Sequence, residues 1–156
     1  MSSWDALTRE LDAWADAGQQ AALWWRDDDA IIPTRALDQL IDIAGLYQAP
    51  LTLAVIPART TKMLFHTLKG HSHIRVAQHG YAHVNNAGPG QKKIELGGGF
   101  DDQRLMRDLK IGRDRLSEIF EAPVTMLVPP WNRIEERVIK QLPALGYRTL
   151  SAFAQK

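Results

Sequence analysis

Three short segments of the chain each place ligand-type side chains directly after an apolar run. They are residues 24–29 (WWRDDD), 78–83 (QHGYAH) and 128–132 (VPPWN). Carboxylate and imidazole groups together suit a divalent metal ion, and a site with only three protein ligands leaves one position open for water. Taken together, the three segments indicate the site of a metal-dependent hydrolase.

Apolar periodicity predicts that helices and strands alternate along the chain. The expected helices are residues 4–17, 34–47, 60–69, 101–120 and 135–145, and the expected strands are residues 22–26, 51–56, 74–78, 124–128 and 147–152. This order predicts an α/β fold with a parallel sheet or barrel, in which ligands bind at the carboxyl ends of the strands. The three segments follow the first, third and fourth expected strands, so all three lie at that end.

Composition limits the classes of protein that fit. The 156 residues, of which 45% are hydrophobic, can bury one core, and we expect a single domain over residues 1–156. The formal charge of +1 gives no field that would attract nucleic acid or an anionic membrane, so neither is expected as a partner. Because the chain has no cysteine, a metal must be held by His, Asp or Glu. The N-terminus lacks a targeting pattern and no apolar run approaches a membrane span, which predicts a cytoplasmic protein.

The acidic and histidine segments each have a second interpretation. Asp27, Asp28 and Asp29 could form a solvated turn. A carboxylate that follows a buried, Trp-rich strand, however, needs a cation to offset its desolvation. In the metal interpretation, one acid binds the ion and a neighbouring acid acts as a base. His79 and His83 would lie on one side of a turn, although such pairs also occur hydrogen-bonded without metal.

Other polar residues near these segments have several candidate roles. Pro130 and Trp131 could end a strand or contact substrate. Arg26 and Arg133 could bind an anionic substrate group or pair with the acids. Glu95 lies in a long glycine-rich loop that could cover the site, and its side chain is expected to be solvated.

Taken together, the segments resemble the polysaccharide deacetylase family, also called the NodB-homology domain, over nearly all of the chain. The resemblance implies a distorted β/α barrel. The family's aromatic-Asp-Asp motif supplies a general base and then a metal ligand, which implies Asp27 as the base and Asp28 as the ligand, with Asp29 where the family has glycine. The family's His-(Ser/Thr)-x-x-His motif implies His79 and His83 as the other metal ligands, with glycine in place of the hydroxyl residue.

The family's third motif, Arg-Pro-Pro-(Tyr/Phe), resembles residues 128–131 and implies that the second proline and the tryptophan form a wall of the site. Val128 replaces the motif's arginine, which normally orients the base, so that task would pass to Arg26 or Arg133. No residue matches the family's late motifs, one of which supplies the general acid.

Five strands are also too few to close a barrel of this kind. The resemblance therefore implies either a domain that lacks its C-terminal part or an open relative of the family. The exposed edge of the fifth strand would invite pairing with a second copy of the chain.

We therefore expect a metal-dependent hydrolase that removes an acetyl or other acyl group from an amide or ester of a carbohydrate or small molecule. It would act on carbon–nitrogen bonds other than peptide bonds, with zinc as the expected ion. An alternative is a catalytically silent domain that binds carbohydrate or a partner through the same cleft. A non-haem iron oxygenase, whose facial triad also has two histidines and one carboxylate, fits less well because helices and strands alternate throughout.

Overall fold

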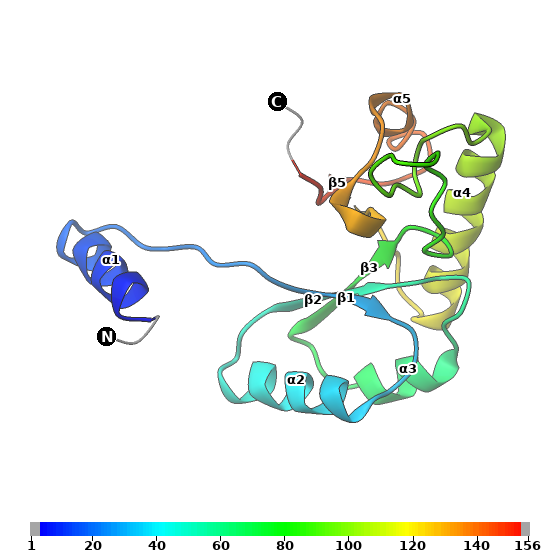
Figure 1. The fold of residues 1–156 in the computed structure, drawn as a ribbon. Helices are drawn as coiled ribbons and strands as arrows, with labels where there is room; N and C mark the ends of the chain where they lie inside the picture. Colours follow the sequence, from blue (N-terminus) through cyan, green and yellow to red (C-terminus); the bar gives the residue numbers. More distant parts are fainter. Residues whose placement is uncertain (1–3, 154–156) are drawn as a thin grey trace.

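The computed structural model describes residues 4–153 and has an α/β fold. Its helices are α1 (Asp5–Asp16), α2 (Arg35–Leu46), α3 (Lys62–Leu68), α4 (Asp102–Ile119) and α5 (Glu136–Ile139), with a 3-10 turn η1 (Pro130–Asn132). Its strands are β1 (Trp25–Ala30), β2 (Leu51–Val55), β3 (Ile74–His79), β4 (Met126–Val128) and β5 (Thr149–Leu150). The strands form one parallel sheet in the order β1-β2-β3-β4-β5, so β1 and β5 are its two edges (Figure 1). The predicted α/β class and the open, incomplete barrel are confirmed.

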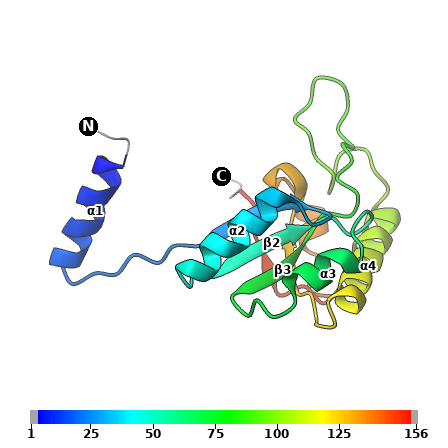
Figure 2. The same ribbon diagram turned by 90° about the horizontal axis from the view of Figure 1, so that it is seen from below.

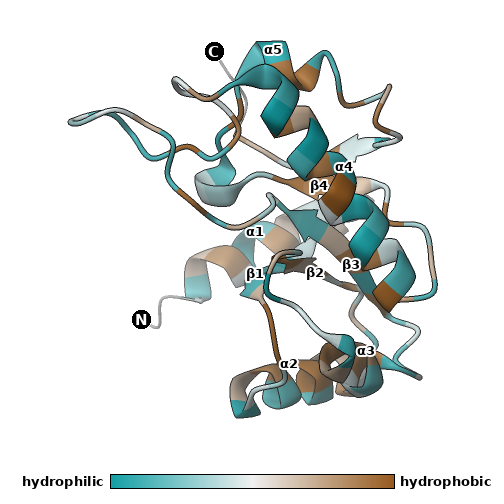
Figure 3. Ribbon diagram, turned by 90° about the vertical axis from the view of Figure 1, so that its right-hand side faces the viewer, coloured by the Kyte–Doolittle hydropathy of each residue, from teal (hydrophilic) through white to brown (hydrophobic). Residues whose placement is uncertain are grey.

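Helices α2, α3 and α4 pack on the same face of the sheet. Leu51, Leu53 and Val55 of β2 pack into one cluster with apolar residues of α2 and α3, which lie across β2 and β3 in Figure 2. Polar and apolar residues alternate along α4, and its apolar stripe packs on Leu127 of β4 (Figure 3). Because successive strand residues point to opposite faces, Ala54 and other small or polar residues line the face without helices.

Helix α1 has a different environment from the other helices. None of its residues is buried, and it stands away from the sheet at the end of an extended segment (Figures 1 and 2). In the described part of the chain, no helix combines the length and the apolar character that crossing a membrane requires.

Several element boundaries differ from the sequence-based expectation, including those of β1 and α5. Strand β1 begins at Trp25 and runs through the three aspartates, whereas Leu23, in the expected strand 22–26, is 82% exposed. The pairing of Trp25 with Leu51 fixes this start, because the residues before it have no neighbouring strand. Helix α5 covers only one turn of the expected helix 135–145, since Pro143 cannot continue a helical hydrogen-bond pattern.

A buried polar cluster fixes the carboxyl end of β3. The hydroxyl of Tyr147 donates to Oε1 of Gln78 at 2.6 Å and to the carbonyl of Leu109 at 3.0 Å. Nε2 of Gln78 donates to the carbonyls of Gly80 at 2.8 Å and Leu109 at 3.2 Å. Burial raises the pKa of Tyr147 well above its usual value, so it remains a donor at physiological pH. The cluster ties the strand end that carries His79 to α4.

Gly112 in α4 permits this close approach. An added Cβ would lie 2.5 Å from Nε2 of Gln78 and 3.0 Å from Cγ of Pro57. Because the Gln78 amide is buried and hydrogen-bonded, it cannot move aside at low cost. We expect Gly112→Ala to lower the free energy of unfolding by about 1–2 kcal/mol, measured by urea denaturation, despite the better helix propensity of alanine.

Gly45 in α2 is the matched control for this substitution. Its added Cβ would lie 3.6 Å from the His73 ring, which is an ordinary contact. Gly45→Ala should therefore raise the free energy of unfolding by roughly 0.5–1 kcal/mol through helix propensity. A stabilised Gly112→Ala protein would contradict the account of this helix contact.

Candidate metal centre

A bulge in β1 determines which acids reach the site. Asp27 is paired with Leu53 and Ala30 with Val55, so Asp28 and Asp29 together stand opposite one residue of β2. Asp29 has φ 67°, in the left-handed region that aspartate tolerates better than most residues. The extra residue breaks the simple alternation of the strand and turns the backbone beyond it.

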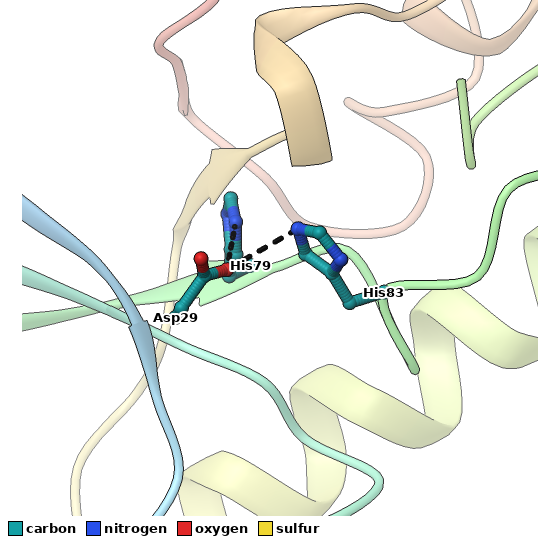
Figure 4. Close-up of side chains that lie close together, drawn as sticks. All are labelled: Asp29, His79 and His83. Atoms are coloured by element: carbon teal, nitrogen blue, oxygen red, sulfur yellow. Dashed lines mark ion pairs between the residues drawn. The ribbon is translucent and has the colours of Figure 1, made fainter. Parts of the chain in front are cut away.

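The structure brings Asp29, His79 and His83 together (Figure 4). Oδ1 of Asp29 lies 3.1 Å from Nε2 of His79 and 3.2 Å from Nε2 of His83. His79 ends β3 and is buried, His83 lies on the turn that follows, and the Asp29 side chain is 63% exposed. These three residues could hold a metal ion, with Asp29 standing where the sequence analysis expects Asp28.

The protonation of His79 favours a cation at this position. Its Nδ1 lies 2.9 Å from the carbonyl of Val128, which can only accept, so Nδ1 carries the proton. Burial lowers the pKa of His79 and outweighs the opposing effect of Asp28 and Asp29. Nε2 therefore faces a carboxylate oxygen, an arrangement that a cation between the two atoms would stabilise.

The spacing of these atoms also suits zinc. Ligand atoms on a tetrahedral zinc ion are about 3.3 Å apart, because the individual bonds are about 2.0–2.1 Å long. The two distances from Asp29 Oδ1 to the histidine nitrogens, 3.1 and 3.2 Å, are close to this value. The donor set therefore fits a divalent ion that accepts nitrogen and oxygen ligands.

Asp28 is bound to Arg26 rather than to the histidines. Its Oδ1 lies 2.8 Å from Nε of Arg26, and its Oδ2 accepts from NH2 of Arg26 at 2.9 Å. Arg26 also donates to Oδ1 of Asn132 at 2.6 Å and to Oγ of Ser151 at 2.5 Å. Oδ1 of Asp28 is buried, and Nε of Arg26 is the group that faces it.

Asp27 points away from this group. It is paired with Leu53 of β2, which packs against α2, and it lines a cavity of about 370 Å³ that Asp28 and Asp29 also line. Burial raises the pKa of Asp27, and the neighbouring charges of Asp28 and Asp29 add to the effect. Asp27 therefore faces the side of the sheet that α2 covers, away from the histidines, because it precedes the bulge.

The turn after β4 places an aromatic ring beside the candidate metal ligand His83. Trp131 has φ 55°, and its ring centroid lies 4.4 Å from that of His83. Pro130 is buried in the same turn. Arg133 points elsewhere, because its NH1 donates to the carbonyl of Lys93 at 3.1 Å on the surface.

Three residues near the site make contacts that the sequence analysis did not predict. Asn132, in the turn after β4, and Ser151, directly after β5, hold the guanidinium of Arg26, and their place after strand ends could have indicated this. Glu95 is only 4% exposed, so the expectation of a solvated side chain is wrong. Its carboxylate accepts from backbone N–H groups of the turn that carries His83.

Comparisons place this fold among known structures. No protein-family model and no curated protein sequence matches the chain. The deacetylase PplD of Streptococcus pyogenes, in complex with acetate, is similar with a TM-score of 0.63 and 15% identity, over 94% of this chain and 62% of that one. A family 4 carbohydrate esterase from Streptomyces lividans, also in complex with acetate, has a TM-score of 0.65 and 11% identity, over 83% and 62% of the two chains.

A third similar structure is a mutant of a CE4 family pseudoenzyme with restored enzymatic activity. Its TM-score is 0.66 at 14% identity, over 81% of this chain and 43% of that one. The chain thus has the fold of the CE4 family deacetylases, the fold that the resemblance implied. It spans about three fifths of the length of the first two structures.

The Arg26–Asp28 pair should contribute measurably to stability. Replacing Arg26 with methionine leaves the carboxylate without its cation, and we expect a loss of about 2 kcal/mol in the free energy of unfolding. This is below the roughly 3–5 kcal/mol of a fully buried pair, because 30% of the Asp28 side chain is exposed. Adding Asp28→Asn should recover part of the loss, with a coupling of at least about 1 kcal/mol in a urea double-mutant cycle.

The exposed pair of Lys140 with Glu136 provides the control. Lys140→Ala should cost at most about 0.5 kcal/mol, because both partners are largely solvated. If Arg26→Met had an effect as small as this one and showed no coupling to Asp28, the Arg26–Asp28 pair would not stabilise the fold.

Proposed function

We propose that the protein is a metal-dependent deacylase that removes an acetyl or other acyl group from an amide or ester of a carbohydrate or small molecule. The observation that carries this proposal is the convergence of Asp29 Oδ1 and the two histidine Nε2 atoms. The deacetylase fold supports the same reaction class.

Asp29, His79 and His83 would hold the ion, and zinc is the proposed metal. When bound, a divalent ion of this kind acts as a Lewis acid on an acyl carbonyl and lowers the pKa of water. The hydrogen bond from Nδ1 of His79 to the Val128 carbonyl orients the ring and fixes its tautomer. Asp29 adds the negative charge of the ligand set.

Asp28 is proposed as the general base. The two-point contact with Arg26 orients its carboxylate, which would take the proton of an attacking water. The order of base and then metal ligand in the family motif is thus kept. Both roles lie one residue later than in the sequence analysis, on Asp28 and Asp29 instead of Asp27 and Asp28. Arg26 takes the orienting task of the motif arginine that Val128 replaces.

The substrate side of the site is proposed from the turn after β4. Pro130 and Trp131 would form a wall beside His83, where a sugar ring could stack on the indole. The two similar structures in complex with acetate are consistent with an acetyl group as the one removed. The cytoplasmic location and pairing of a second copy along β5 stay predictions.

A catalytically silent domain that binds carbohydrate remains the second candidate. It is favoured by Val128 in place of the motif arginine, and one of the similar structures derives from a pseudoenzyme. Under this alternative the cleft would bind an acetylated sugar without releasing acetate, even when zinc is supplied.

The three consecutive aspartates allow a matched test. We expect Asp29→Asn to lower zinc affinity at least about 100-fold in calorimetry, because it removes a charged ligand. Asp28→Asn should retain zinc and lower acetate release from N-acetylglucosamine oligomers by about 10²–10⁴-fold, the range for loss of a general base. Asp27→Asn should change neither quantity, because Asp27 is paired with Leu53 on the face of the sheet that α2 covers.

The outcomes separate the assignments. Loss of zinc in the Asp28 variant, with zinc retained in the Asp29 variant, would return the ligand role to Asp28. Zinc binding and sugar binding without acetate release from the wild-type protein would favour the silent domain.

A further inference from the structure

Glu95 is a buried carboxylate that the proposed reaction does not use. Only 4% of the residue is exposed, although it lies in the loop between β3 and α4. Burial raises its pKa, and hydrogen bonds from the backbone N–H groups of Ala82, Tyr81, Val84 and His83 oppose that rise. An acid in this position needs such donors because it has left water.

The donors belong to the turn that carries His83. Oε1 of Glu95 accepts from the backbone N–H of Ala82 at 2.8 Å, and Oε2 accepts from that of Tyr81 at 3.2 Å. Successive N–H groups that converge on one anion form a nest, which fixes the backbone that supplies them. The carboxylate therefore stabilises a turn that belongs to no helix or strand.

Gly80 makes room for the carboxylate. It has φ 56°, and an added Cβ would collide with Oε2 of Glu95 and lie 2.7 Å from the ring of Pro130. The hydroxyl residue that the family motif has at this position could not fit here. The lack of a side chain at Gly80 thus leaves the space that the Glu95 carboxylate occupies.

The loop holds Glu95 from both sides. The side chain of Asn86 donates to the Glu95 carbonyl at 2.6 Å, and the Asn86 N–H donates to the carbonyl of Ile94 at 2.7 Å. Leu96 forms a parallel bridge with Ile134. The tip of the loop projects from the body (green in Figure 2), whereas its return to Glu95 is anchored.

His83 needs this support because its backbone is strained. Its φ of 59° is a left-handed conformation, which costs of the order of 1–3 kcal/mol and persists only where the surroundings determine it. With this backbone, Nε2 of His83 lies 3.2 Å from Asp29 and the ring lies against Trp131. Relaxation of the turn would move the ring away from both.

We propose that Glu95 is the positioning residue of His83, and that its carboxylate holds the 80–83 turn in the conformation that brings the ring to Asp29 and His79. The metal-binding consequence rests on the proposed function, whereas the placement of the ring does not. Glu95→Gln is the direct test, because the amide has nearly the same shape but presents an N–H₂ group where an acceptor is needed.

The first readout is independent of metal. In metal-free protein, NMR should show nuclear Overhauser contacts between the rings of His83 and Trp131, whose centroids are 4.4 Å apart. We expect these contacts to be lost in Glu95→Gln. Retention of wild-type contacts in a folded Glu95→Gln protein would overturn the proposal.

Glu135→Gln is the matched control. Glu135 accepts from the backbone N–H of Gly98 at 2.7 Å, near the other end of the same loop, so its loss weakens the loop without touching the 80–83 turn. The control should keep the ring contacts. If Glu95→Gln does not fold, Glu95→Asp decides, since it keeps the charge but withdraws it by one methylene; unchanged ring contacts in that variant would overturn the proposal.

The second readout is zinc affinity by calorimetry. Loss of a residue that orients a metal ligand typically lowers affinity by about 10–100-fold, and we expect this for Glu95→Gln but not for Glu135→Gln. Wild-type affinity in Glu95→Gln would count against the proposal. If the wild-type protein bound no zinc, the proposed function would fail, and the ring contacts alone would decide the role of Glu95.

Discussion

The contact between Arg26 and Asp28 is the interaction on which the arrangement of the site depends. Arg26 lies on one edge strand of an open sheet, and its guanidinium also binds Asn132 after β4 and Ser151 after β5. One side chain therefore links the two edges of the sheet at its carboxyl end, where the described strands leave the sheet open. Both oxygens of Asp28 face the guanidinium, so Arg26 compensates the charge of this acid. Asp29 is then the acid that lies beside the two histidines.

Four residues of the site have left-handed backbones: Asp29, His83, Trp131 and Asn132. Asp29 lies in the bulge of β1, His83 lies on the turn that Glu95 fixes, and Trp131 lies in the turn whose Asn132 binds Arg26. Such conformations are costly and tend to gather where a fold serves a function rather than its own stability. Their occurrence around one group of ligand atoms supports a functional site more strongly than any single distance does.

The sequence predicts the order of elements and the edge of the sheet at which the site lies, because periodicity and strand ends are local properties. It does not predict which acid meets the histidines, since a single extra residue changes the phase of a strand and a bulge leaves no periodic signal. The burial of Glu95 was not predicted for a different reason. Its burial follows from the N–H groups of a turn distant in sequence, and a lone glutamate among glycines gives no sign of that contact.

The central claim is that Asp29, His79 and His83 bind a metal while Asp28 stays on Arg26. Anomalous diffraction from crystals of the zinc-loaded protein tests it most directly. We predict one anomalous peak within about 2.0–2.2 Å of a ligand atom from each of Asp29, His79 and His83, with the Arg26–Asp28 contact intact. A peak bonded to Asp28, or no peak among these residues at saturating zinc, would contradict the account.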